Sequence, residues 1–166
     1  MKLNIACGKM LLNDYTNYDL LPFTDKNGKT TDILGDIRNL INHFTPDSVD
    51  EILAYHCLEH LIISDVIHVL NQCYTILKEG GKLLIECPDM IKSFDYYIIK
   101  RNNPKGYAHC MMGGDSVKYG ETWAHKSMWS GEMMAEQIKL KFKNVVIGDG
   151  LSHNCARRDF RVTGEK

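Results

Sequence analysis

The chain has 166 residues, of which 44% are hydrophobic and 25% charged, and its formal net charge at pH 7 is −1. This composition is typical of a globular protein, and the length suits one domain, residues 1–166, with a single substantial core. No dense run of basic and aromatic residues gives a strong nucleic-acid signal. No apolar run approaches the ~18 residues that would span a membrane.

Cysteine usage and the first residues indicate a compartment. The six cysteines are widely spaced and form no CxxC pair, which favours reduced thiols over a secreted disulfide framework. Met1-Lys2 leads directly into an apolar segment, so no signal peptide is expected. We therefore expect a cytoplasmic protein, with a homo-oligomer left open.

Strand-like and helix-like segments alternate along the chain, which predicts an α/β fold. The longest expected helix, residues 61–77, has apolar residues at helical spacing, with Ser64 and Asp65 as its cap and Gly80-Gly81 as its end. Strands are expected at 2–6, 17–21, 31–35, 49–54, 82–87, 144–148 and 159–163, and further helices at 36–44, 90–101 and 129–140.

Residues 102–124 are rich in glycine and are expected to be irregular, although they are too long for a simple connection. We expect residues 102–128 to form an insertion on the substrate side of the fold. Gly113-Gly114 permits a tight turn. Tyr119, Trp123 and Trp129 could stack on a flat or sugar-like acceptor, or could instead bury the loop against the sheet. Residues 100–166 have an excess of basic side chains, and Lys126 and its basic neighbours could hold a phosphate or carboxylate.

Residues 3–20 are the most informative stretch. An apolar run ends in a turn of small residues, Ala6-Cys7-Gly8, and a second extended segment ends on Asp19, eleven positions after Gly8. In an open parallel sheet, the backbone approaches a nucleotide-like ligand at such a turn, and an acid ending the next strand binds ribose hydroxyls. The spacing is shorter than in the dinucleotide fingerprint, which has three glycines and an acid about 20 residues further on.

Four segments, taken in order, resemble the class I S-adenosylmethionine-dependent methyltransferases. The opening LNIACG…NYDL is similar to the family's LNLGCG…NVDL, GDIRNL matches the acidic turn after the third strand, HCLEH matches H-x-L-E-H, and LKEGGKLLIE is similar to LKPGGKLLIE. The resemblance covers most of residues 1–90. It implies a Rossmann-like fold with a mostly parallel seven-stranded sheet and helices on both faces, and S-adenosylmethionine as cofactor. Ala6 stands where the family's first glycine normally lies, and the loop that follows is short.

The resemblance also implies which residues hold the cofactor. The small-residue turn would pass its backbone under the methionine end, and Asp19 would accept hydrogen bonds from both ribose hydroxyls. Asp36 would take the adenine amino group, cap the following helix, or do both. The implied cofactor-binding set is Ala6, Cys7, Gly8, Asp19, Leu20, Asp36, Ile37, Tyr55 and His56.

Methyl transfer requires alignment of the acceptor and, where the acceptor is protonated, removal of a proton. His56 and His125 are the expected catalytic residues, and Glu59 and His60 are further candidate bases, although these two could instead orient the following helix. His56-x-x-Glu59-His60 also satisfies the inverted zinc-peptidase motif, which needs both histidines one turn apart on a helix. Because His56 directly follows a strand, we expect no metal site and keep the zinc peptidase as a remote alternative.

These inferences predict an S-adenosylmethionine-dependent methyltransferase acting on oxygen or nitrogen of a small-molecule or glycan-type acceptor. A non-catalytic protein that binds S-adenosylmethionine or S-adenosylhomocysteine is the main alternative, because Ala6 and the short loop weaken the cofactor signature.

Overall fold

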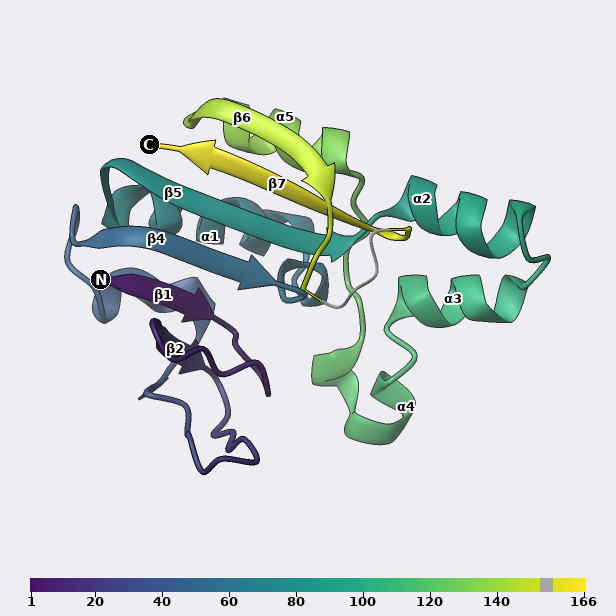
Figure 1. Cartoon of the computed structure of the whole chain (residues 1–166), viewed down its shortest axis with the longest axis horizontal. Coiled ribbons are helices and arrows are strands. Elements are labelled where there is room, and N and C mark those ends of the chain that lie inside the picture. The colour runs from purple at the N-terminus through teal and green to yellow at the C-terminus, as the bar shows by residue number, and fades with distance from the viewer. Residues whose placement is uncertain (153–156) are drawn as a thin grey trace.

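The computed structural model of the chain describes residues 1–152 and 157–166 and contains a seven-stranded sheet (Figure 1). The strand order is β3-β2-β1-β4-β5-β7-β6, in which β7 is antiparallel to both neighbours and the other pairs are parallel. The strands are β1 (Lys2–Ile5), β2 (Thr16–Asp19), β3 (Ile33–Leu34), β4 (Val49–Tyr55), β5 (Leu77–Pro88), β6 (Lys143–Asp149) and β7 (Asp159–Glu165). The predicted seven-stranded, mostly parallel α/β fold is confirmed.

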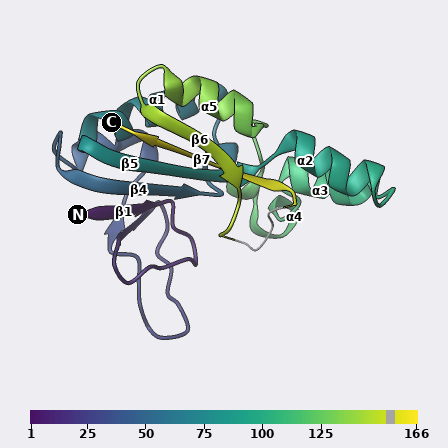
Figure 2. The same cartoon turned by 45° about the horizontal axis from the view of Figure 1, so that its top comes forward.

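Helices occupy one face of this sheet and one end of it. Figures 1 and 2 show α1 and α5 on the same face, whereas α2, α3 and α4 extend beyond the carboxyl end of β5. Among the described residues no helix packs on the opposite face, so the expectation of helices on both faces is met on one face only. The helices are η1 (Ile37–Asn42), η2 (Leu58–His60), α1 (Ile63–Ile76), α2 (Met90–Phe94), η3 (Asp95–Ile99), α3 (Pro104–Met112), α4 (Ser116–Tyr119), η4 (Glu121–Trp123) and α5 (Gly131–Lys139).

The core lies between the sheet and the α1/α5 layer. Alternate residues of each strand point to this face because side chains alternate across a strand. The strand residues Leu3, Ile5, Ile52, Ala54, Leu83, Ile85 and Val162 form one buried cluster with Val66, Val69, Cys73 and Ile76 of α1 and Met134 and Ile138 of α5. The five described cysteines are free and buried, and Cys155 lies outside the described residues.

The predicted bounds of α1 agree with the structure within two residues, but its predicted caps are wrong. The helix begins after Ile62, with no side-chain cap from Ser64 or Asp65. It ends at Ile76, and Leu77 is already extended because β5 starts there. Gly80 does adopt a positive φ of +76°, but it lies within β5, where the pairing register with β4 shifts. Gly80 therefore allows the irregular pairing within β5 and does not end the helix, because the left-handed conformation of glycine occurs in strand irregularities as well as at helix ends.

The segment expected to be irregular, 102–124, is largely helical. Pro104 is in the first turn of α3, and the Asn103 side chain accepts a hydrogen bond from the amide of Gly106. Proline at the first helical position after an Asn cap is a recognised start signal. Gly113, with φ +66°, ends α3 in the left-handed conformation, which confirms the expected tight turn.

The connection from β1 to β2 contains no helix and is held by two buried asparagines. Asn4 Nδ2 donates to Asn17 Oδ1 at 3.0 Å and to the Met10 carbonyl at 2.6 Å. Asn17 also accepts from the amide of Leu12 and donates to the carbonyls of Leu12 and Tyr15. These bonds satisfy backbone groups that a helix would otherwise pair within itself.

We expect Asn17→Ala to destabilise the fold by about 2 kcal/mol, because it leaves several buried backbone groups of this connection unpaired. Chemical denaturation followed by circular dichroism measures the change. Asn42→Ala, at an exposed position, is the control and should be near neutral. Equal stability of the Asn17 variant and the natural chain would contradict the role given to this network.

Candidate functional site

The turn after β1 has the backbone of a close-approach loop. Ala6 and Gly8 both adopt positive φ angles, +46° and +52°. The Gly8 amide donates to Asp19 Oδ2 at 2.8 Å, and the Cys7 amide donates to the Tyr18 carbonyl. A Cβ placed on Gly8 would meet nothing within 4 Å. The surface above Gly8 is therefore open. The side chain of Cys7, by contrast, is buried, and this burial together with the nearby charge of Asp19 raises the pKa of the Cys7 thiol to about 12.

Ala6 is under backbone strain, because the left-handed region costs a residue with a side chain roughly 1–2 kcal/mol. Glycine avoids this cost but loses more chain entropy on folding. We therefore expect Ala6→Gly to stabilise the protein by about 0.5–1 kcal/mol in equilibrium denaturation. Ala54→Gly in β4 is the control and should destabilise it. A destabilised Ala6 variant would show that the methyl group of Ala6 contributes packing worth more than the strain.

The acid at the end of β2 is held rigidly. Asp19 Oδ1 accepts from the amide of Leu21 at 3.0 Å while its other oxygen accepts from Gly8. The carboxylate is thus fixed beside the turn after β1, as the sequence predicted. Leu20 is 56% exposed beside it.

Asp36 caps η1, which is one of the two roles expected for it. Its side chain accepts from the amide of Arg38, and the Arg38 guanidinium binds both carboxylate oxygens and also reaches Asp65. These hydrogen bonds from Arg38 lower the pKa of Asp36. Ile37 is buried in the core, so it supports the turn that carries Asp36.

At the carboxyl end of β4 the chain turns sharply. Tyr55 lies beside Arg161, whose guanidinium donates to the tyrosine hydroxyl at 3.4 Å. The next residue, His56, has a φ of +50°. Such strained non-glycine residues occur preferentially at functional sites. Arg161 also binds Glu86 on the adjacent strand β5, and the Glu86 carboxylate accepts from the amides of Leu151 and Ser152.

His56 lies between two buried carboxylates. Its Nδ1 is 3.4 Å from Glu59 and its Nε2 is 3.5 Å from Asp159, and these acids have side chains only 4% and 1% exposed. Burial alone would lower the pKa of His56, but the two acids outweigh it and the net shift is upward. Burial acts to raise the pKa of Glu59, yet His56 and the neighbouring histidines hold it at about 2.

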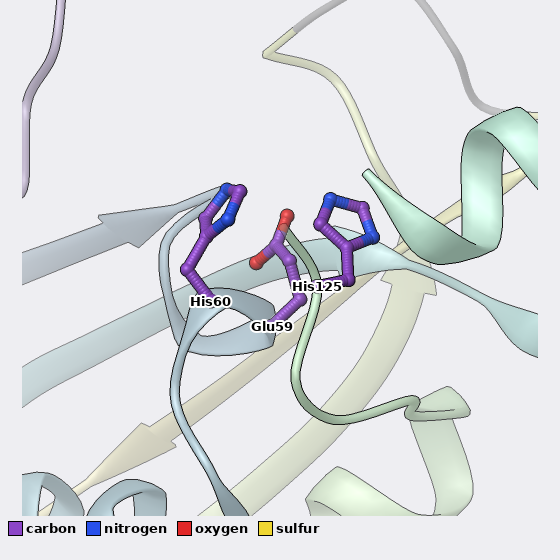
Figure 3. A group of neighbouring side chains, drawn as sticks. All are labelled: Glu59, His60 and His125. Carbon is purple, nitrogen blue, oxygen red and sulfur yellow. The ribbon is translucent and has the colours of Figure 1, made fainter. Parts of the chain in front are cut away.

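His60 and His125 also lie beside Glu59. Figure 3 shows the two imidazoles flanking the carboxylate, with His60 and Glu59 on η2 and His125 on the segment after η4. One ligating atom from each residue lies within 4.8 Å of the other two. The rings of His60 and His125 meet edge to face at 4.9 Å. Burial lowers the pKa of His125, so its imidazole is neutral at pH 7.

A short strap, residues 124–127, fastens His125 to η2. The amides of Lys126 and Ser127 both donate to the Glu59 carbonyl, at 2.7 and 3.2 Å. His60 Nδ1 pairs with the Ala124 carbonyl at 3.2 Å. Because this strap is bonded on both sides of His125, the position of that imidazole is set by the backbone.

The aromatic residues that were expected to stack on an acceptor differ in their burial. Trp129 is buried, 3% exposed, and its indole donates to Ser127 at 2.8 Å, so it anchors the strap and offers no stacking surface. Trp123 is half-buried, and the side chain of Tyr119 lies outside the described part of the chain.

The helix required by the inverted zinc-peptidase motif is not formed, because His56 precedes η2 in a strained turn and η2 has three residues.

Two site residues were missed by the sequence analysis. Asp159 begins β7 far along the chain from His56, and Glu86 lies inside the apolar strand β5. An acid within an otherwise apolar strand was the available signal for Glu86. No local pattern marks Asp159, because its proximity to His56 comes from the pairing of β5 with β7.

The comparisons with known proteins agree with this arrangement. The family described as "Methyltransferase domain" matches residues 5–85. A SAM dependent methyltransferase from Archaeoglobus fulgidus is 16% identical, with 99% of this chain and 85% of the other covered and a TM-score of 0.66. Residues 5–85 therefore match a methyltransferase domain, and the chain has the fold of S-adenosylmethionine-dependent methyltransferases.

Other solved structures of methyltransferases share the fold. A Thermotoga maritima SAM-dependent methyltransferase, described as a possible histamine N-methyltransferase, is 17% identical with a TM-score of 0.64, and the match covers 99% of this chain and 81% of the other. A Haloferax volcanii methyltransferase, solved with a methyltransferase activator, is 14% identical with a TM-score of 0.60, covering 99% and 80%. No protein of curated function matches this chain.

The methyltransferase-domain match and the shared fold imply S-adenosylmethionine as the methyl donor. The open surface above Gly8 and the fixed carboxylate of Asp19 fit such a ligand, which needs close backbone approach and an acceptor for hydroxyl groups. Within residues 1–152 and 157–166, no helix has the length and hydropathy needed to cross a membrane.

Proposed function

We propose that this enzyme methylates an oxygen or nitrogen atom of a small-molecule or glycan-type acceptor, bound between the end of β4 and the 102–128 insertion. The observation that carries the proposal is the cluster of His56, Glu59 and His125, which joins the cofactor edge of the sheet to the insertion.

The proposed cofactor contacts follow from the fixed turn and its neighbours. The backbone of Ala6, Cys7 and Gly8 would lie under the methionine end, and Asp19 would accept from the ribose hydroxyls with lone pairs that its backbone partners leave available. Asp36, supported by Ile37, would accept from the adenine amino group in the same way. Tyr55, His56 and the exposed Leu20 would complete the wall of the site.

When bound, S-adenosylmethionine supplies a methyl carbon on a positively charged sulfur, which leaves as a neutral thioether. The acceptor atom forms the new bond to that carbon as the carbon–sulfur bond breaks, and the acceptor's proton must be taken up. The lowered pKa of His125 favours its neutral imidazole, which can take this proton, whereas the acids beside His56 raise the pKa of His56 and favour its protonated form. His56 therefore orients Glu59 and the end of β4.

The test combines calorimetry with turnover. We expect micromolar binding of S-adenosylmethionine and S-adenosylhomocysteine, and methyl transfer in a screen that starts with sugars and anionic metabolites. His125→Ala should lose turnover with cofactor affinity unchanged, while His68→Ala, at an exposed site on α1, should retain both. Binding without turnover on any acceptor would instead support the non-catalytic alternative. No binding at millimolar cofactor would overturn the proposed site.

A further inference from the structure

The pair of histidines that flank Glu59 has the composition of a metal centre. Two imidazole nitrogens and one carboxylate oxygen form the ligand set that divalent zinc and iron take in sites with open positions. Ligands at about 2.1 Å from a tetrahedral metal lie about 3.4 Å apart. The three ligating atoms here are within 4.8 Å of one another, so small rotations of the two half-buried imidazoles would complete the set (Figure 3).

A second observation points to a missing cation. Oε2 of Glu59 is buried and has no hydrogen-bond partner among the described residues. Buried carboxylate oxygens are almost always paired, and the contact with His56 is made by the other oxygen, Oε1. A metal ion bound through Oε2 would satisfy the unpaired atom.

The outer hydrogen bonds of both histidines favour coordination. A backbone carbonyl can only accept, so the contact of His60 Nδ1 with the Ala124 carbonyl places the proton on Nδ1 and leaves the Nε2 lone pair free. His125 is likewise bonded through its ring to the Met111 carbonyl. Ligating histidines characteristically donate their second nitrogen in this way, which fixes the tautomer and the ring.

We propose that Glu59, His60 and His125 bind a divalent transition-metal ion, with at least one coordination position open. The site joins η2 to the insertion, so the open position faces the volume assigned to the acceptor. In the bound state the ion holds an acceptor oxygen and lowers its pKa, taking over the proton release otherwise assigned to His125. This role in catalysis rests on the proposed function, whereas the binding of the ion does not.

The full chain, stripped with a chelator and dialysed, is titrated with Co²⁺ in the absence of cofactor and acceptor. We expect one equivalent to bind, with visible absorption typical of a low-coordinate site. His60→Ala and His125→Ala should each raise the dissociation constant for Co²⁺ by about 10-fold to 100-fold. His68→Ala should bind Co²⁺ as the natural chain does. Thermal denaturation of each apo variant checks that it remains folded.

His125→Cys provides a second, direct measurement, because a thiolate on Co²⁺ adds a charge-transfer band in the near ultraviolet. The absence of stoichiometric binding, or binding unchanged in both alanine variants, would overturn the metal site. Cofactor titrations of the chelator-treated protein are run separately. Metal binding without cofactor binding would refute the proposed function alone, and cofactor binding without metal binding would refute this inference alone.

Discussion

Replacing Asp19 by alanine is expected to raise the dissociation constants for S-adenosylmethionine and S-adenosylhomocysteine by about 10²-fold to 10⁴-fold. Two charge-assisted hydrogen bonds to ribose hydroxyls account for this range, because each contributes about 1.5–3 kcal/mol. The carboxylate is already oriented by the amides of Gly8 and Leu21, so no rearrangement is needed on binding. Calorimetric titration of both ligands measures the change.

Two further variants sharpen this result. Asp19→Asn keeps the shape of the side chain and one acceptor oxygen, so its affinity should be intermediate. Asp14→Ala removes an exposed acid of the same connection and should bind normally. Because Asp19→Ala also removes two bonds to the backbone, its thermal stability must be recorded beside its affinity. A folded Asp19→Ala protein with less than a fivefold loss of affinity would show that the ribose lies elsewhere.

Gly113→Ala is expected to reduce turnover by about 10²-fold while leaving cofactor affinity near that of the natural chain. A Cβ at this position would lie 2.3 Å from the Trp123 carbonyl oxygen and 2.7 Å from the His125 amide, and φ is +66°. Both neighbours are backbone atoms, so the strap that carries His125 must move. Displacement of a catalytic group by about 1 Å costs rate on this scale.

The adjacent glycine supplies a matched control. The three atoms nearest to a Cβ on Gly114 all belong to the ring of His109, an exposed side chain that can rotate away. Steady-state rates and cofactor titrations of Gly114→Ala should therefore resemble those of the natural chain. If the two glycine variants lost turnover equally, the insertion as a whole, and not the placement of His125, would control the rate.

The sequence was sufficient for the sheet and for the turn after β1. The strands predicted at 2–6, 49–54 and 82–87 are short segments rich in apolar residues, and all three are found. The pairing of an acid at position 19 with the small-residue turn was also predicted, because both come from consecutive strands. Sequence patterns of this kind predict contacts between elements that are consecutive in the chain.

The centre around Glu59 could not be predicted in the same way. His125 reaches Glu59 only because Gly113 turns the chain and the strap bonds to η2, and Asp159 reaches His56 through an antiparallel strand pair. The H-x-x-E-H spacing suggested that His56 and His60 act together. The strained turn at His56 instead directs its imidazole to Glu59 and Asp159, whereas His60 packs against His125 and bonds to the strap. This difference is a consequence of tertiary packing that no spacing rule contains.

The helix-free connection between β1 and β2 has an electrostatic consequence. In nucleotide-binding α/β folds a helix usually begins after the glycine turn, and its macrodipole attracts the negative end of the ligand. Here no peptide dipoles are aligned behind Ala6-Cys7-Gly8, so only individual amides are available to the carboxylate of the cofactor. We therefore expect most of the binding free energy to come from the ribose, whose hydroxyl groups donate to the charged carboxylate of Asp19.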